Sequence, residues 1–458
     1  MGRASGRVVG GDVNMDTGWI SKLQRVGGGR SGLSAVLQSL VVKLLVVAIN
    51  TATGIITARM LRPDGRGELA AMILWPVFLA NALTLGVPSS LVYNLRREPE
   101  RESQFLSAAL LLGVLLGLAA ILAGVALMPY WLAQYRMETI LIAQWMMLHA
   151  PLCTLMLVGR ASLEARGEFG LSNATLFFTP LLGLAGLTGL ALAGAMTPFR
   201  AALTYVFNGV PVFCWMVWRM WRLFRPRWTG LLASLRTLLP YGVRAYGIDL
   251  LGAMSLQIDQ ALVIGFLSPA AMGTYVVALS LSRMLQLFQQ AVVMVLFPKA
   301  AARPADEVIA LTGRAARIST VMTSMAGIAV MLGGQWMLRL LYGAEFVAAT
   351  NLLRLLVLEV IFASTALVLA QAFMALGRPG TVTVLQGIGL ALSVPLMLVL
   401  IPRYGLLGAG LALAISAAVR LLLMMLCFPW LLNERSPKLL FGREDWMFVR
   451  QQLIKVQA

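Results

Sequence analysis

The sequence predicts an all-α integral membrane protein with about twelve transmembrane helices, arranged as two six-helix lobes around a central cavity. Three observations support this fold class. The 458 residues are 59% hydrophobic and only 12% charged, with a mean hydropathy of +0.82. Apolar runs long enough to cross a bilayer recur along the chain, and two short motifs recur 206 and 210 residues apart. A water-soluble domain of this size could not bury so much apolar surface, so we expect the bilayer to be its solvent.

The apolar runs locate the spans, because a helix needs about 20 predominantly apolar residues to cross the hydrocarbon core. Strands of a β-barrel are shorter and alternate in hydropathy, so only helices fit these runs. We expect helices in the first half at 36–60, 69–94, 104–128, 139–160, 171–195 and 200–219. In the second half we expect them at 237–265, 270–297, 317–341, 347–374, 381–401 and 405–431.

Two motifs indicate that the second half repeats the first. Residues 61–67 (LRPDGRG) and 267–273 (LSPAAMG) share L-x-P-x-x-x-G at an offset of 206. Residues 165–170 and 375–380 share A-x-G-x-x-G at an offset of 210. We expect the first pair to form tight hairpins, since Pro restricts φ and Gly relieves it. Many transporters consist of duplicated halves that move against each other around a central site.

A basic segment separates the two halves. Residues 219–236 hold Pro226 and five arginines between two apolar regions. An even number of helices in each half would bring both halves into the membrane in the same sense, with their symmetry axis along the membrane normal. The predicted organisation is a tail at 1–35, a lobe at 36–222, a linker at 223–236, a lobe at 237–431 and a tail at 432–458.

Basic residues dominate the charge, and their distribution indicates membrane topology. The net charge is +18 and the pI is about 10.8. If the N-terminus is cytoplasmic, 25 of the 37 lysines and arginines fall on the cytoplasmic side. The opposite side or its helix ends hold Arg59, Arg62, Arg66, Arg136, Arg200, Arg339 and Arg403. The positive-inside rule therefore predicts cytoplasmic termini, with attraction to anionic lipid and no nucleic-acid partner.

The sequence contains no recognisable catalytic constellation. His149, the sole histidine, lies in an apolar span without an acidic partner at helical spacing. Cys153, Cys214 and Cys427 lie within spans and lack metal-ligand spacing. There is no G-x-x-x-x-G-K-[ST] phosphate loop, and no loop is large enough to build the donor site of a transferase. We therefore expect a protein that is not an enzyme and that needs no metal or cofactor.

Polar and ionisable residues inside the predicted spans are candidates for a binding site, because charges at membrane depth generally face a bundle interior or a wet cavity. Helical geometry groups them on faces of the first, seventh, eighth and tenth spans. We expect these faces to line a cavity of net positive charge, suited to an anionic headgroup. The predicted substrate-binding residues are Lys43, Asn50, Arg244, Asp259, Arg283, Gln290 and Arg354. Candidates for ion coupling are Asp249, Asp259 and Glu359.

The same charges are open to a structural interpretation. Arg244 could pair with Asp259, and Glu359 could pair with a residue of another helix. Such ion pairs would hold helices together without contacting substrate. The sequence leaves both interpretations open.

Several segments resemble one transporter family. Asp259, residues 273–278 (GTYVVA) and Phe297-Pro298 give the pattern D…G-x-Y-x-x-A…F-P, and residues 54–68 form a second stretch of this kind. In these motifs the chain is similar to the polysaccharide, or O-antigen-type, flippases. Their superfamily also contains the multidrug and toxic-compound extrusion (MATE) transporters. The resemblance covers roughly residues 36–431 and implies a MATE-like fold.

The resemblance also implies a function. Members of this family move undecaprenyl-diphosphate-linked oligosaccharides from the cytoplasmic to the periplasmic leaflet for polysaccharide export. It therefore implies a multi-pass transporter of the bacterial inner (plasma) membrane that works by alternating access. The implied partners are the polyprenyl-diphosphate-linked glycan, the lipid bilayer, and a glycan polymerase or glycosyltransferases.

Other functions remain as alternatives. A multidrug or cation antiporter of the same superfamily would favour unpaired acidic residues, whereas the predicted cavity is basic. A lipid-linked peptidoglycan-precursor flippase typically carries two further helices. A major-facilitator transporter is disfavoured because residues 62–66 (RPDGR) follow the first span and not the second. A scaffold for a glycan polymerase would gain nothing from charges buried on several helices.

Overall fold

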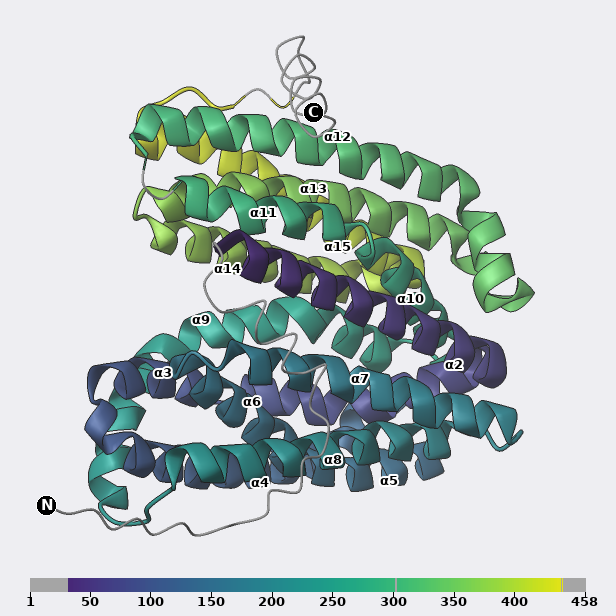
Figure 1. Cartoon of the computed structure of the whole chain (residues 1–458). Helices are drawn as coiled ribbons and strands as arrows, with labels where there is room; N and C mark the ends of the chain where they lie inside the picture. Colours follow the sequence, from purple (N-terminus) through teal and green to yellow (C-terminus); the bar gives the residue numbers. More distant parts are fainter. Residues whose placement is uncertain (1–31, 301–302, 438, 440–458) are drawn as a thin grey trace, which may run out of the picture.

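The computed structural model describes residues 32–300, 303–437 and 439 (Figure 1). Every element of regular secondary structure in these ranges is a helix. Most of the predicted tail at 1–35 lies outside them, as do residues 440–458 of the predicted tail at 432–458. The all-α membrane fold class is confirmed, with large apolar side chains such as Leu122, Met325 and Leu332 exposed on the outside as lipid-facing surface requires.

The N-terminal half contains seven α-helices and two short 3₁₀ turns. The 3₁₀ turns are η1 (Pro99–Arg101) and η2 (Met147–His149). The α-helices are α2 (Gly32–Ala82), α3 (Val87–Arg97), α4 (Glu102–Trp131), α5 (Met137–Met146), α6 (Ala150–Ala165), α7 (Phe169–Leu192) and α8 (Pro198–Phe224). Proline at the first helical turn of α3, α6 and α8 suits positions where the backbone N–H has no helical partner.

The C-terminal half also contains seven α-helices. They are α9 (Leu231–Phe266), α10 (Pro269–Arg283), α11 (Gln286–Ala300), α12 (Ala305–Met337), α13 (Thr350–Ala375), α14 (Pro379–Tyr404) and α15 (Leu406–Cys427). Short turns η3 (Leu338–Tyr342), η4 (Ala344–Ala349) and η5 (Phe428–Leu432) extend α12, precede α13 and extend α15. The non-helical connection between the halves is 225–230, within the predicted linker at 223–236.

The number of spans is close to the twelve predicted. Within the described ranges, nine helices are long and apolar enough to cross a membrane, or eleven when α9 and the α10–α11 pair, both bent, count as one span each. In that count α2 is a single helix, although Arg62 has non-helical backbone angles. Asn50 and Asn81 line one cavity, whereas an unbroken helix would hold them roughly 46 Å apart. The two arms of α2, 32–61 and 63–82, therefore fold back on each other.

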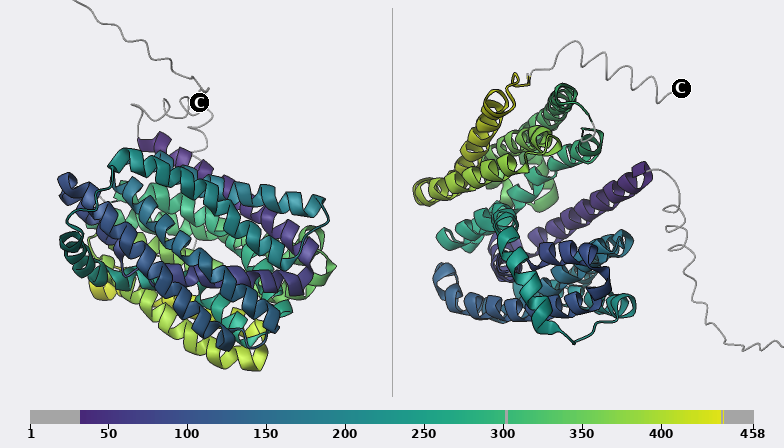
Figure 2. Two further views of the ribbon diagram at one scale, coloured as in Figure 1. Left: turned by 90° about the horizontal axis from the view of Figure 1, so that it is seen from below. Right: turned by 90° about the vertical axis from the view of Figure 1, so that its left-hand side faces the viewer.

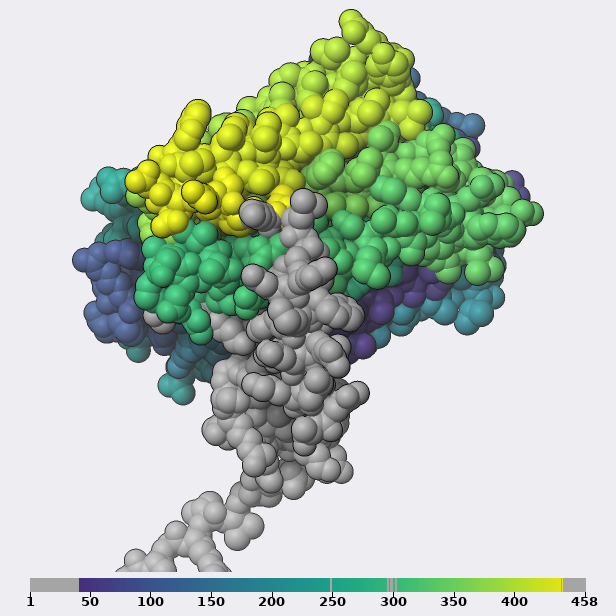
Figure 3. Space-filling view, turned by 90° about the horizontal axis from the view of Figure 1, so that it is seen from above, coloured from purple at the N-terminus to yellow at the C-terminus, as the bar shows by residue number. Residues whose placement is uncertain are grey.

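The helices run side by side in two groups, with α2 and α9 between them (Figure 1). Helices α3 to α8 form one group and α10 to α15 form the other, and Figure 2 shows the groups diverging on either side of α2. From the side of α12 and α15, the C-terminal half covers most of the N-terminal half (Figure 3). We call the region between the groups the seam.

The first part of α9 packs on the N-terminal half, although the sequence assigns it to the C-terminal lobe. Tyr241 stacks on Tyr93 of α3 with ring centroids 4.2 Å apart, and the Ser90 hydroxyl donates to the Leu238 carbonyl at 2.7 Å. Gly242 lies so close to Gly86 that a Cβ on Gly86 would sit 2.1 Å from the Gly242 carbonyl oxygen. Helix α9 therefore links the two groups along the seam.

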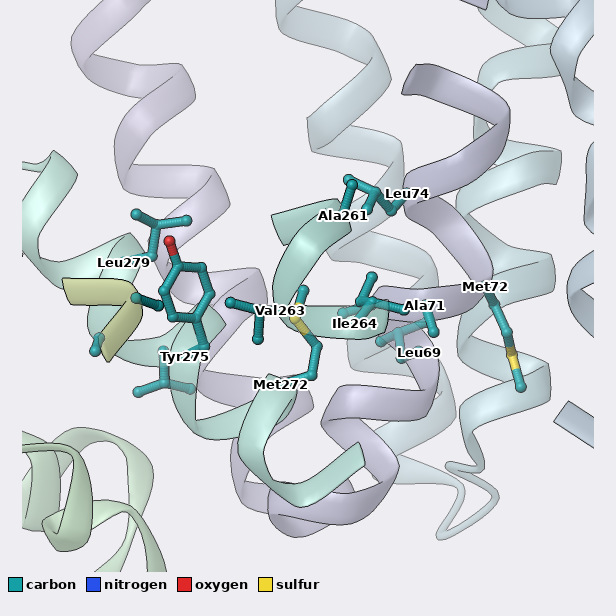
Figure 4. Packing of buried hydrophobic residues seen from close by; sticks show 14 of the residues in the cluster. Leu69, Ala71, Met72, Leu74, Ala261, Val263, Ile264, Met272, Tyr275 and Leu279 are labelled. Atoms are coloured by element: carbon teal, nitrogen blue, oxygen red, sulfur yellow. The ribbon is translucent and has the colours of Figure 1, made fainter. Parts of the chain in front are cut away.

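The two repeated hairpins pack directly against each other. A Cβ on Gly67 would lie 1.7 Å from the Pro269 carbonyl oxygen, and a Cβ on Gly273 would lie 2.0 Å from the Pro63 carbonyl oxygen. Each half thus presents its glycine to the proline of the other, which is the reciprocal contact that a twofold axis produces. Figure 4 shows the apolar packing that continues from this contact between α2, α9 and α10. The motif predicted to form hairpins also joins the halves.

The second repeated motif ends a helix in the same way in both halves. Gly167 and Gly377 have positive φ values of 84° and 72°. The amide that follows each glycine donates to a carbonyl five residues back, Glu168 to Leu163 and Arg378 to Phe373, both at 2.8 Å. This is the Schellman arrangement, in which glycine adopts the left-handed conformation at low cost. The A-x-G-x-x-G repeat therefore encodes a shared helix stop.

The polar contacts between α2 and the helices beyond α9 lie at one end of the molecule, which we call the hairpin end. Arg62 of α2 forms an ion pair with Glu345 at 3.6 Å, and Arg59 donates to the carbonyls of Leu340 and Leu341. Among the described residues, no other hydrogen bond or ion pair joins α2 to the helices beyond α9. These contacts therefore join α2 to the C-terminal group at the hairpin end.

Candidate functional site

An ion pair between a buried carboxylate and a half-buried arginine lies in the C-terminal half, between α9 and α10. Asp259 is 3% exposed, and its Oδ2 accepts hydrogen bonds from the Tyr275 hydroxyl at 2.8 Å and from Arg283 Nη2 at 3.3 Å. Its Oδ1 has no hydrogen-bond partner among the described residues. Arg283 also donates to the Leu256 carbonyl at 3.3 Å. Asp259 thus pairs with Arg283, and not with Arg244 as the structural interpretation of the sequence suggested.

Two further charges lie near this ion pair on other helices. Glu359 of α13 interacts electrostatically with Arg283 and with Arg420 of α15. The side chain of Arg420 covers Gly389 of α14, and a Cβ on that glycine would lie 3.3 Å from the arginine Cδ. Two predicted ion-coupling residues, Asp259 and Glu359, therefore belong to one electrostatic cluster. The third, Asp249, lies apart from them and accepts hydrogen bonds from the Ser89 hydroxyl at 2.9 and 3.1 Å.

The other predicted substrate-binding residues are more exposed than Asp259. Lys43, Arg244 and Arg354 are exposed, and Gln290 of α11 is half-buried. Arg354 donates to Asn351 at 3.2 Å and to the Met331 carbonyl at 3.4 Å. Within the described residues, Asn50 is the member of the predicted set that lines either of the two cavities described next.

The first of these cavities lies inside the N-terminal half and has a volume of about 450 Å³. We call it the lobe cavity. Both arms of α2 and the helices α6, α7 and α8 form its wall. Its polar lining consists of Asn50, Thr53, Asn81, His149, Arg160, Thr175, Thr179, Tyr205 and Asn208. The described lining contains amides, hydroxyls, one histidine and one arginine, and no carboxylate.

The second cavity lies at the seam and has a volume of about 390 Å³. We call it the seam cavity. It is enclosed by the second arm of α2, by η2, α7 and α8, and across the seam by α9 and α10. Its polar lining consists of Arg66, His149, Thr179, Tyr205, Gln257 and Gln260. Because His149, Thr179 and Tyr205 line both cavities, the two adjoin.

Sequence reasoning missed most of this lining. Arg66 was predicted from the charge distribution to lie on the non-cytoplasmic side or at a helix end, yet it is only 8% exposed. His149, predicted to lie in an apolar span without an acidic partner, lines both cavities. The repeat contained a signal that could have identified Arg66 as a site residue: the equivalent position in the second half is Met272, which carries no charge. A charge present in one copy only indicates a role that the shared architecture does not require.

The helical bundle has two repeated halves, one polar cavity inside the N-terminal half and one at the seam, an architecture shared by many membrane transporters. Residues 56–351, more than half of the chain, match the family described as "Polysaccharide biosynthesis protein", and the chain belongs to this family. The protein is therefore a member of the polysaccharide biosynthesis family with an all-helical membrane fold. The predicted family is confirmed.

A curated relative supports this placement. A probable low-salt glycan biosynthesis flippase, Agl15, of Haloferax volcanii is 24% identical over 194 residues. The aligned region covers 42% of this chain and 41% of that protein, so the chain spans about two fifths of the relative it matches.

Solved structures confirm the MATE-like fold. The lipid II flippase MurJ in an inward closed conformation matches with a TM-score of 0.75 and 13% identity, covering 90% of this chain and 89% of MurJ. An inward-facing MATE-family multidrug resistance transporter matches with a TM-score of 0.66 and 15% identity, covering 84% of this chain and 96% of that one. At such identities the likeness shows the fold alone.

Proposed function

We propose that the protein flips an undecaprenyl-diphosphate-linked oligosaccharide from the cytoplasmic to the periplasmic leaflet of the bacterial inner membrane. The observation that carries the proposal is a polar cavity at the seam between repeated halves, in a chain of the polysaccharide biosynthesis family. Arginines in and near the seam suit a diphosphate, because guanidinium groups bind phosphate oxygens in pairs. Glycan polymerases or glycosyltransferases would supply and consume the substrate.

The mechanism we propose is alternating access. The hairpin contact and the Arg62–Glu345 ion pair would close the periplasmic end while the glycan enters from the cytoplasm. The prenyl tail would stay in lipid beside the seam, and rocking of the halves would then expose the headgroup outward. Two negative charges moving out across an inside-negative membrane gain roughly 2.3 kcal/mol per charge per 100 mV. Proton or ion exchange at Asp259 or Glu359 is a further proposed source of drive.

Transport in proteoliposomes tests this function. Fluorescent undecaprenyl-diphosphate-linked oligosaccharide on one leaflet should reach the other at a rate that depends on the protein, as scored by enzymatic access to the glycan. Arg244→Ala and Arg283→Ala should slow this exchange at least tenfold, while the exposed Arg403→Ala should not. Normal exchange by the correctly inserted Arg244 and Arg283 variants would refute the cationic site.

A peptidoglycan-precursor flippase is the second candidate, favoured by the likeness to MurJ. The same liposomes loaded with lipid II distinguish the two functions, because a glycan flippase should leave lipid II on its original leaflet. A cation extruder is less well supported, since the buried carboxylate of Asp259 is paired with Arg283.

A further inference from the structure

Arg66 is a buried cation without a counter-charge. It lies one turn into the second arm of α2, is 8% exposed, and its Nε and Nη1 have no hydrogen-bond partner among the described residues. The ionisable side chains that interact with it are the phenols of Tyr205 and Tyr342, and none of the ion pairs formed by described residues includes it. A guanidinium taken out of water is strongly destabilising unless an anion or polar groups compensate it.

The surroundings of Arg66 are also polar and unpartnered. His149 Nδ1 and Gln257 Oε1 are buried without a hydrogen-bond partner among the described residues, and both side chains line the seam cavity with Arg66. Gln260 lies on the same wall, one turn along α9 from Gln257. Buried polar atoms are normally satisfied, so unsatisfied atoms around one cavity indicate a polar occupant. The volume of about 390 Å³ far exceeds the roughly 30 Å³ that one water takes up.

The internal repeat separates the role of the charge from the role of the position. Met272 occupies the position equivalent to Arg66, 206 residues later, and is fully buried at the same crossing of the hairpins. Figure 4 shows Met272 among the apolar side chains of α9 and α10. An apolar residue of similar length therefore satisfies the architecture, and the arginine charge serves another purpose.

We propose that Arg66, with Gln257 and Gln260, binds an oxyanion of the phosphate class in the seam cavity beside the hairpin end. The planar guanidinium presents paired donors that match phosphate oxygens, and the two glutamine amides can turn their NH₂ groups toward the same anion. The source is either the diphosphate of a polyprenyl lipid, in which case the site rests on the proposed function, or free inorganic phosphate acting as a counter-ion.

Thermal unfolding of the full-length protein in lipid nanodiscs tests the site. The probes are inorganic phosphate, inorganic pyrophosphate and farnesyl diphosphate, each titrated into a gluconate buffer at constant ionic strength. Each probe that binds should raise the Tm of the wild type in a saturable manner. Arg66→Met should weaken this response at least tenfold, Arg66→Lys should weaken it less, and the exposed Arg403→Met at the same end should leave it unchanged.

The unliganded proteins provide the structural readout. Because Met272 occupies the equivalent site, Arg66→Met should unfold in gluconate at the wild-type Tm or above it. Equal anion responses in the wild type and Arg66→Met would overturn the proposal. So would a lower Tm of Arg66→Met in gluconate together with no anion response in the wild type, because Arg66 would then be structural.

The three probes, together with the proteoliposome assay, also distinguish the anion site from the transport function. A response to farnesyl diphosphate that requires Arg66 assigns the lipid diphosphate, whereas a response to inorganic phosphate alone assigns a free counter-ion. Both outcomes support the site. If the proteoliposomes show no glycan exchange but the Arg66-dependent response persists, the proposed function fails and the site stands. If exchange occurs and Arg66→Met responds like the wild type, the site fails and the function stands.

Discussion

The two halves of the molecule share a scaffold but have different interiors. Both carry the Pro–Gly hairpin, and both end a helix with a glycine of positive φ. An arginine of each motif loop, Arg166 or Arg378, also donates to a carbonyl near the end of the last helix of its half. In the interiors, Arg66 faces a cavity where Met272 packs in apolar surroundings, and buried Thr53 corresponds to buried Asp259. The repeat is thus kept where the backbone requires a residue type and lost where side chains face the interior.

The hairpin glycines should show the largest effect, because they test the shared scaffold. Gly67→Ala and Gly273→Ala each place a Cβ within 2.0 Å of a backbone carbonyl oxygen, which a side-chain movement cannot relieve. We expect a loss of several kcal/mol for each, seen as little folded protein on size exclusion in detergent. Gly54→Ala is the control, since no atom lies within 4 Å of its added Cβ, and it should be neutral or stabilising by up to about 1 kcal/mol. Normal folding of both hairpin variants would contradict the close contact between the two hairpins.

The Asp259–Arg283 ion pair tests the interior of the C-terminal half, and the effect should be intermediate. Asp259→Ala removes the ion-pair partner of Arg283, whose side chain is 35% exposed, and the hydrogen-bond acceptor of the Tyr275 hydroxyl. We expect a loss of about 1–3 kcal/mol in the free energy of unfolding. The double variant Asp259→Leu/Arg283→Leu should recover most of it.

Glycan exchange by that double variant decides the role of the ion pair. Recovered stability with recovered exchange would make the pair structural. Recovered stability without exchange would assign it to transport, because the scaffold would then be intact.

The helix-stop glycines should show the smallest effect, and it should be equal in the two halves. Gly167→Ala and Gly377→Ala meet no atom within 4 Å, so the cost comes only from the left-handed backbone. We expect about 1–2 kcal/mol for each, measured as a matched fall in Tm. Gly170→Ala and Gly380→Ala, in the same motifs but without positive φ, should change Tm little. Unequal losses at 167 and 377 would show that the two stops are not equivalent.

Sequence reasoning predicted the scaffold well because its signals are local. Apolar runs mark spans wherever they occur, and the Pro and Gly of each motif impose their backbone conformations on the residues beside them. The site residues were harder, because helical periodicity says which residues share a face but not which helix that face meets. Asp259 therefore pairs with Arg283 of the next helix, α10, and not with Arg244 of its own helix, α9. The substrate-binding set from Lys43 to Arg354 remains a prediction.

The amino-acid pattern alone determined the fold class, the repeat, the family resemblance and the helix stops, since each depends on neighbouring residues and on the preference of apolar surface for lipid. Only the tertiary structure decided what the hairpins contact and which side chains enclose a cavity. Arg66 illustrates the reason. The charge distribution predicts it on the non-cytoplasmic side or at a helix end, yet it is 8% exposed beside Tyr205, Gln257 and Tyr342, which lie far from it in the sequence. Burial and missing counter-charges depend on such long-range contacts, and local sequence does not specify them.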